Sequence, residues 1–160
     1  MKKVIGVVLV TLGGAVIGAI VMNKMSSSIV RMKEGKINKF KGYYNLLLQW
    51  LDRKQEGRSL SEYFTKKGYK RIAIYGMGEV GNRLYNELKN TEVEVKFVID
   101  KNSNATYSPL EVKELEELDG SETVDLIVVT VPHVFEEIQK EVSMRLSSPV
   151  VSVEEVIYEL

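Results

Sequence analysis

Hydrophobic positions divide the chain into three stretches with different spacing. Residues 4–22 are almost continuously apolar, with Thr11 as their single polar side chain and no charge. As a helix rising about 1.5 Å per residue, this run would be about 28 Å long, close to the hydrocarbon thickness of a bilayer. The pattern predicts a transmembrane anchor over residues 1–23. A cleaved signal peptide is the alternative, because Lys2 and Lys3 resemble its basic start, but the run is long for one and no A-x-A site follows.

The second stretch, residues 24–68, alternates lysines with apolar residues at three- and four-residue steps. This spacing predicts a basic juxtamembrane connector that is helical from Ser27 to Gln55. Gly35, Gly42 and Gly57 are the expected interruptions, so one or two helices are predicted.

The connector also carries an aromatic cluster, Tyr43, Tyr44 and Trp50. These rings could lie at the bilayer interface, pack on the globular domain or form the docking surface of a partner. Nucleic-acid binding is a fourth possibility, and we do not expect it because lipid headgroups already explain the neighbouring cations.

A short helix is expected at the end of the connector. Ser59 and Glu62 have the spacing of a capping box, and Gly68 is placed to close the helix after Lys67. Tyr63 and Lys67 form a Y-x-x-x-K pair of the kind that short-chain dehydrogenases use for proton transfer. Here the pair precedes the glycine loop instead of following it, so we interpret it as a coincidence.

The third stretch, residues 69–160, alternates β-branched runs with segments of helical spacing. This alternation predicts an α/β fold, a small Rossmann-like domain of three layers around a parallel sheet. The expected strands are residues 71–75, 93–99, 124–131 and 149–153. The expected helices are residues 80–88, 110–118, 134–146 and 153–160.

A glycine-rich loop, Gly76-Met77-Gly78-Glu79-Val80-Gly81, lies between the first strand and the first helix of this domain. In this context Gly76 permits a tight turn, Gly78 allows a pyrophosphate to approach the backbone, and Gly81 allows the helix to pack closely on the strand. The exposed N–H groups at the helix start would then bind the anion.

Two strand ends complete the candidate site. Asp100 follows the second strand, 19 positions after Gly81, where an acid binds ribose hydroxyls. This favours NAD or another nucleotide with a free 2′-hydroxyl over NADP, although Lys101 weakens the preference. Thr130, Pro132 and His133 end the third strand and are expected to face the same crevice. His133 could carry a proton or contact the ribose, but a lone histidine here is more often a loop residue without chemistry.

Charge is distributed unevenly along a chain that is neutral as a whole. The net charge is +2 for residues 1–22, +9 for residues 23–71 and −11 for residues 72–160. Basic residues after an apolar span favour the cytoplasmic side, where they contact anionic lipid. We therefore expect a single-pass protein of the cell membrane with a cytoplasmic globular domain. Gly14 and Gly18 form a GxxxG face through which a homo-oligomer could assemble.

The amino-acid composition and the length argue against several kinds of functional site and one class of protein. The chain has no cysteine and one histidine, which argues against disulfides, thiol nucleophiles and metal sites. With 160 residues there is room for one modest globular domain, so a two-domain dehydrogenase does not fit. The acidic residues between Glu111 and Asp119 are most simply a solvated helix face.

The segments 70–81, 97–100 and 124–132 together resemble known nucleotide-binding domains. They are similar to the domain of nucleoside-diphosphate-sugar epimerase and dehydratase-like polysaccharide biosynthesis proteins. They also look like the CoA-binding-like Rossmann domain of polyprenyl-phosphate sugar-1-phosphate transferases. The resemblance implies a phosphate loop at Gly76, Gly78 and Gly81, a ribose contact at Asp100, and a crevice lined by Thr130 and Pro132.

No tyrosine and lysine pair, sugar-binding domain or transferase domain follows these segments. We therefore expect a non-catalytic accessory or regulatory protein of cell-surface polysaccharide synthesis. It would bind NAD or a nucleotide sugar and act on a membrane-bound glycan-synthesis enzyme. The alternatives are an enzyme completed by a partner, a ligand-sensing domain like those that regulate potassium transport, and a scaffold that binds nothing.

Overall fold

The chain forms two compact units, Met1–Lys41 and Gly42–Leu160. The computed structural model describes residues 2–103 and 108–160, with side chains for Met22, residues 30–103 and residues 108–160. Within the residues whose side chains the structure describes, no helix is long and apolar enough to cross a membrane. The predicted span, residues 4–22, lies outside them except for Met22, so the anchor stays a prediction.

A single helix, α1 (Lys2–Gln55), replaces the interrupted connector that the glycines predict. Gly35 and Gly42 lie inside the helix, and a Cβ at either position would meet no atom within 4 Å. The expectation of a break at these two positions was wrong, because a helix tolerates isolated glycines at about 1 kcal/mol each when good helix formers surround them. Gly57 has φ of 76° and follows the end of α1 as expected.

The short helix α2 (Ser61–Lys67) ends at Gly68, which adopts the left-handed conformation expected of it. Only half of the predicted capping box forms. The Glu62 carboxylate accepts the Ser59 N–H at 3.0 Å, whereas the Ser59 hydroxyl lies 2.8 Å from that of Ser61. The helix therefore begins at Ser61, with Leu60 in the N-cap position that the sequence suggested for Ser59.

A five-stranded parallel sheet forms the centre of the unit Gly42–Leu160, in the order β3-β2-β1-β4-β5. This α/β arrangement is compatible with the expected Rossmann-like domain. Because the strands are parallel, the loops that follow β1, β2 and β4 emerge at one edge of the sheet. The strands are β1 (Arg71–Tyr75), β2 (Glu94–Ile99), β3 (Val112–Lys113), β4 (Leu126–Val129) and β5 (Val150–Ser152).

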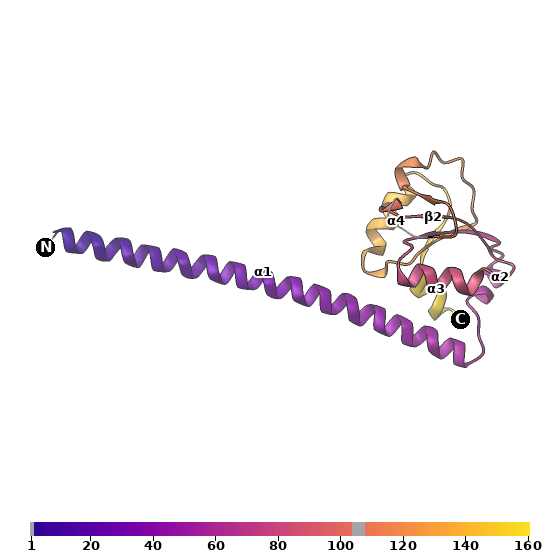
Figure 1. Cartoon of the computed structure of the whole chain (residues 1–160), viewed down its shortest axis with the longest axis horizontal. Coiled ribbons are helices and arrows are strands. Elements are labelled where there is room, and N and C mark those ends of the chain that lie inside the picture. The colour runs from indigo at the N-terminus through magenta and orange to yellow at the C-terminus, as the bar shows by residue number, and fades with distance from the viewer. Residues whose placement is uncertain (1, 104–107) are drawn as a thin grey trace. The chain divides into compact units, whose positions relative to one another are not determined.

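Helices cover both faces of the sheet, and side chains of β1 alternate between the two cores. Ile72 and Ile74 pack with α1, α2, α3 and α5, while Ala73 and Tyr75 pack on the face that α4 covers. Figure 1 shows α3 and α4 on either side of the sheet. The helices are α3 (Glu79–Leu88), α4 (Phe135–Ser143) and α5 (Val153–Tyr158), with 3-10 turns at Leu115–Glu117 and Pro132–Val134.

The helix expected over residues 110–118 does not form. Val98 N–H donates to the Glu111 carbonyl and Asp100 N–H donates to the Lys113 carbonyl, so this segment extends the sheet as β3. The Glu117 carboxylate then accepts the Glu114 N–H at 2.8 Å and closes a single 3-10 turn. Pairing with the edge of β2 outweighs the helical spacing, because it satisfies backbone groups of both segments.

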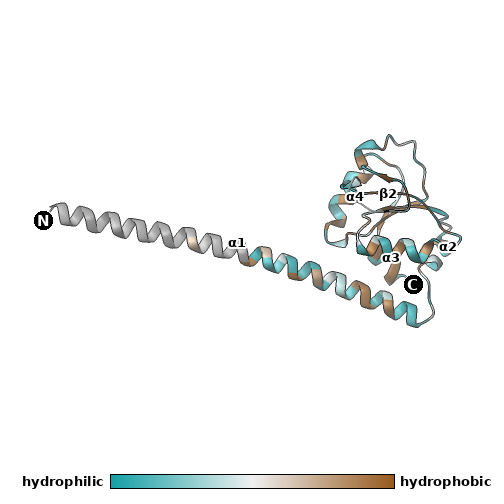
Figure 2. Cartoon of the chain, viewed as in Figure 1, coloured by the Kyte–Doolittle hydropathy of each residue, from teal (hydrophilic) through white to brown (hydrophobic). Residues whose placement is uncertain are grey.

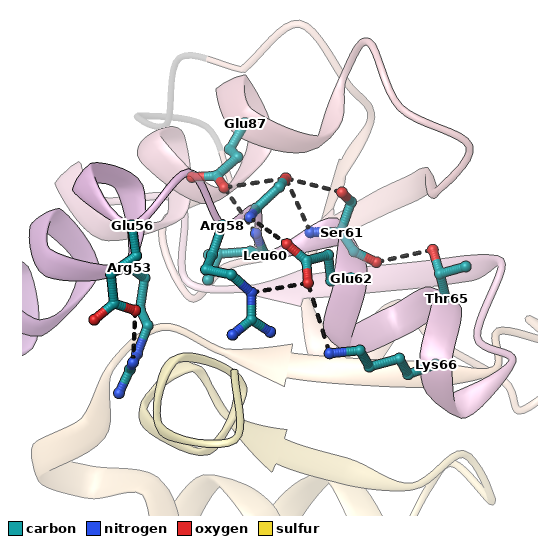
Figure 3. Close-up of polar contacts among 10 residues, drawn as sticks. Arg53, Glu56, Arg58, Leu60, Ser61, Glu62, Thr65, Lys66 and Glu87 are labelled. Atoms are coloured by element: carbon teal, nitrogen blue, oxygen red, sulfur yellow. Dashed lines mark hydrogen bonds and ion pairs between the residues drawn. The ribbon is translucent and has the colours of Figure 1, made fainter.

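Glu87, near the end of α3, fastens α1 and α2 to the globular unit. Its carboxylate accepts the Trp50 indole N–H at 2.7 Å, the Leu60 N–H at 2.8 Å and the Lys54 ammonium at 3.1 Å. Figure 3 shows the carboxylate directed at the turn that contains Leu60. Leu46 and Trp50 are buried with the core on this face. Residues 42–68, a connector by sequence, therefore pack in the same unit as the sheet.

Candidate functional site

The loop between β1 and α3 requires two of its three glycines for packing. Gly76 has φ of 92°, and a Cβ there would lie 2.6 Å from Val131 Cγ2. At Gly81 a Cβ would collide with the Gly76 carbonyl oxygen. No side chain fits at either position, so both glycines hold the loop against α3 and the end of β4.

Gly78 is different, because nothing lies within 4 Å of the position that its Cβ would occupy. It precedes α3 in an extended conformation, with φ of −72° and ψ of −163°, which any residue can adopt. Packing does not require a glycine here. The open space beside Gly78 is what a loop needs if a ligand is to approach its backbone closely.

Hydrogen bonds from neighbouring strands fix the loop. Gly76 N–H donates to the Ile99 carbonyl at 2.8 Å, and Met77 N–H donates to Asp100 Oδ2 at 2.8 Å. The Asn82 side-chain amide donates to the Met77 carbonyl at 2.9 Å. The loop is therefore rigid before any ligand binds, which lowers the entropy that binding would cost.

The first turn of α3 is open to solvent. Gly78 and Glu79 are exposed, whereas Met77, Val80 and Gly81 are buried. No side chain caps the helix start, so the first N–H groups carry the positive end of the helix dipole toward solvent. The Glu79 side chain is 93% exposed and lies 3.7 Å from Arg83. An anion would meet backbone donors at Gly78 with no packed side chain in the way.

Asp100 lies beside the loop, at the end of β2. One of its carboxylate oxygens accepts the Met77 N–H and the other accepts the Asn102 N–H at 3.0 Å. Each oxygen has a further lone pair, so the predicted ribose contact stays a prediction alongside this structural role. Lys101 forms an ion pair with Glu141 at 3.3 Å.

At the end of β4, the three predicted residues have different environments. Thr130 is buried, and its hydroxyl donates to the carbonyls of Tyr75 and Gly76. It therefore supports the turn at Gly76. Pro132 is half-buried and His133 is exposed, within a 3-10 turn.

Sequence reasoning did not place Tyr43 or Asn82 at this site. The Tyr43 ring packs edge-on against His133, with ring centroids 5.9 Å apart. Burial raises the pKa of Tyr43 above its usual value. The Tyr43 contact joins residues far apart in the chain, so no local pattern could indicate it. Asn82 did carry a local signal, because an amide four residues after Gly78 can reach back to the loop carbonyls of a helix start.

A hollow of about 310 Å³ lies beyond His133, at the ends of β4 and β5. Its lining includes the acids Glu136, Glu137 and Glu154. These carboxylates disfavour a phosphate in the hollow.

The Y-x-x-x-K pair does come together, but not in a form suited to proton transfer. Lys67 Nζ lies 3.4 Å from the Tyr63 hydroxyl, which donates to Glu155 at 3.0 Å. Burial, together with the hydrogen bond to Glu155, raises the pKa of Tyr63 to about 12. Proton transfer at neutral pH needs a lowered tyrosine pKa, so this pair has a structural role.

Comparison with known proteins adds a family to this description. Residues 68–148, from just before β1 to just after α4, match the model of the family described as C2185-like, N-terminal. The matched segment contains the glycine loop, Asp100 and the end of β4. Comparisons with curated proteins and with solved structures gave no match. The chain therefore belongs to the C2185-like, N-terminal family.

Proposed function

We propose that this chain is a membrane-anchored, non-catalytic protein that binds a nucleotide at its glycine loop. NAD and nucleotide sugars are the proposed ligands, and a membrane-bound glycan-synthesis enzyme is the proposed partner. The domain is proposed to be Rossmann-like and cytoplasmic. The role in cell-surface polysaccharide synthesis is proposed from the sequence resemblance of the loop and the two strand ends.

One observation carries the ligand proposal, namely the open space at Gly78. Gly76 and Gly81 are required by their neighbours, but at Gly78 a side chain would meet no atom within 4 Å. A stable loop of this shape would accept a larger residue at Gly78. A loop that binds a ligand through the Gly78 backbone would not accept a larger residue, because the new side chain would occupy the ligand's place.

The surroundings of Gly78 support an anionic ligand. The exposed start of α3 offers uncapped N–H groups, and Asp100 lies within a hydrogen bond of the loop. A phosphate would bind the helix start while a ribose hydroxyl could reach the carboxylate. The non-catalytic role is proposed from the sequence, in which the Tyr63 and Lys67 pair precedes the glycine loop and was interpreted as a coincidence.

The test measures unfolding of the full chain, purified in detergent micelles, with and without candidate ligands. Trp50 is the single tryptophan and is buried in the globular unit, so its fluorescence reports unfolding of that unit. NAD, NADP, coenzyme A and UDP-sugars are compared. A ligand present at about a hundred times its dissociation constant should add about 2.7 kcal/mol to the unfolding free energy.

Gly78→Asp is the informative variant. Aspartate is a preferred residue at a helix start, so stability without ligand should rise by a few tenths of a kcal/mol to about 1 kcal/mol. The stabilisation by ligand should disappear, because the new carboxylate occupies the phosphate position and repels it. Gly78→Asn is the matched control of equal size without charge, and it should retain more of the ligand effect. The proposal fails if none of the four ligands stabilises the parent chain, or if the aspartate variant responds as the parent does.

A further inference from the structure

The part of α1 within the unit Gly42–Leu160 has a buried side and an exposed apolar side. Leu46 and Trp50 are buried against the core. Tyr44, Leu47 and Leu51 lie on a different side of the helix from these two residues and are 64%, 47% and 51% exposed. We call these three residues the α1 stripe. Figure 2 shows brown, hydrophobic turns among the teal ones in this part of α1.

The α1 stripe has the spacing of a helix-to-helix seam. Its residues follow one another at steps of three and four, which places them along one line of the helix surface. In the sequence, the same alternation continues toward the N-terminus at Phe40 and Ile37, both more than half exposed. These five apolar residues, at alternating steps of three and four, have the spacing of the a and d positions of a coiled coil over about two heptads.

A helix that lies flat in a bilayer interface does not explain the α1 stripe. A helix that lies in a bilayer interface places its cations on one polar face. At 100° per residue, the cations that precede the stripe are spread around the helix instead of sharing one side. They are Arg31, Lys33, Lys36, Lys39 and Lys41.

A second copy of the chain does fit, because it supplies an identical stripe that can pack against the first around a two-fold axis. The globular unit contacts α1 through Tyr43, Leu46, Trp50 and Lys54, and the three residues of the stripe stay 47–64% exposed. We propose that two copies of this chain associate through a parallel two-helix seam formed by Tyr44, Leu47 and Leu51. The predicted N-terminal anchors favour the parallel direction, since both helices would leave one membrane the same way.

The chain is well suited to a crosslinking test because it contains no cysteine. Single cysteines are introduced into the full chain at seam positions, as Tyr44→Cys, Leu47→Cys and Leu51→Cys. Matched controls are Asn45→Cys and Asp52→Cys, which are exposed and lie one residue, or about 100°, away from the seam. Each purified chain is oxidised, and disulfide-linked dimers are measured on a non-reducing gel.

Seam positions should form dimers at least about fivefold faster than the two controls, because only they bring equivalent residues face to face across a parallel seam. Equal rates at all five positions, or no dimers at the seam positions, would overturn the proposal. That outcome would leave ligand binding at Gly78 untouched, since the two experiments measure separate surfaces.

A second variant shows whether the seam itself holds the dimer. Leu47→Lys with Leu51→Lys, added to Tyr44→Cys, should abolish crosslinking while Trp50 fluorescence stays that of the folded unit. Asn45→Lys with Asp52→Lys is the control and should leave crosslinking unchanged. If the lysines at Leu47 and Leu51 do not reduce crosslinking in a folded chain, the copies associate elsewhere and the inference is wrong.

Discussion

The Glu87 carboxylate offers the sharpest test of how α1 is attached to the globular unit. It is 10% exposed and accepts hydrogen bonds from the Trp50 indole, the Leu60 N–H and the Lys54 ammonium. In Glu87→Ala, the indole and the Leu60 N–H lose their acceptor inside a partly buried joint. We expect the variant to fold, with α1 and α2 held less firmly against α3.

The cost follows from the donors around the carboxylate, which include the Ser59 hydroxyl at 3.4 Å. A buried donor without an acceptor costs about 1–3 kcal/mol. Lys54 is half exposed, and an ion pair of this kind contributes at most about 1 kcal/mol. Because the four donors share one carboxylate, their costs do not add fully. We expect Glu87→Ala to lower the unfolding free energy by about 3 kcal/mol, and Glu87→Gln, which keeps one acceptor oxygen, by about 2 kcal/mol.

The assay is urea unfolding of the full chain, followed by Trp50 fluorescence and by far-UV circular dichroism. Glu79→Gln is the matched control, because Glu79 lies at the other end of α3 with its side chain in solvent. It should change stability by less than about 0.5 kcal/mol. A loss below about 1 kcal/mol in Glu87→Ala, or an equal loss in the control, would refute the idea that this carboxylate holds the joint.

Two further predictions concern the loop and the amino end of β1. Gly81→Ala should destabilise the unit by about 1–3 kcal/mol in urea unfolding, because its Cβ collides with the Gly76 carbonyl. Gly78→Ser is the control and should lose no stability, because a Cβ at Gly78 meets no atom within 4 Å and serine is a preferred residue at a helix start. Equal losses in the two variants would contradict the packing argument. Asp125 accepts the N–H groups of Arg71 and Lys70, which lowers its pKa. Because the pKa of Asp125 is lower in the folded state, its contribution to the unfolding free energy is complete above its unfolded-state pKa of about 4. The contribution is lost as the pH falls through the folded-state pKa. Asp125→Asn should therefore show a shallower loss of unfolding free energy between about pH 4 and pH 2 than the parent chain, and parallel curves would contradict this assignment.

Much of the sheet was predictable because its local signals agree with its tertiary role. The run before Gly76 predicted β1 with its observed ends, Arg71 and Tyr75. Residues 124–131 were expected as a fully buried strand, and β4 is buried at every position. Gly68 was predicted to close α2 because a left-handed residue there strongly favours glycine.

The failure at residues 110–118 has a long-range cause, because distant backbone decides the local structure there. Residues 110–118 carry leucines at helical spacing, but the free edge of β2 draws Val112 and Lys113 into the sheet. A sequence read segment by segment cannot weigh a hydrogen-bonding edge that another segment supplies. The same limit applied to Tyr43, whose contact with His133 joins residues 90 positions apart in the sequence.

Among the predicted site residues, the structure separates those that shape the loop from those left open to a ligand. Thr130 was expected in the crevice, which stays a prediction, and its hydroxyl bonds to the carbonyls of Tyr75 and Gly76. Its position at a strand end was readable from the sequence, but the direction of its hydroxyl was not. At Gly78, packing does not require a glycine, because a Cβ there would meet no atom within 4 Å.

Helix α3 carries the candidate site at its start and the joint with α1 at its end. Its first turn is open at Gly78, and its last turn carries Glu87, which binds Trp50 of α1. Ten residues of helix extend over about 15 Å, and the buried residues Leu84 and Leu88 pack this helix on the sheet. A rigid, well-packed helix moves as a unit, because a close-packed core transmits displacement instead of absorbing it. The candidate site at the start of α3 and the joint with α1 at its end therefore depend on the same packing of this helix on the sheet.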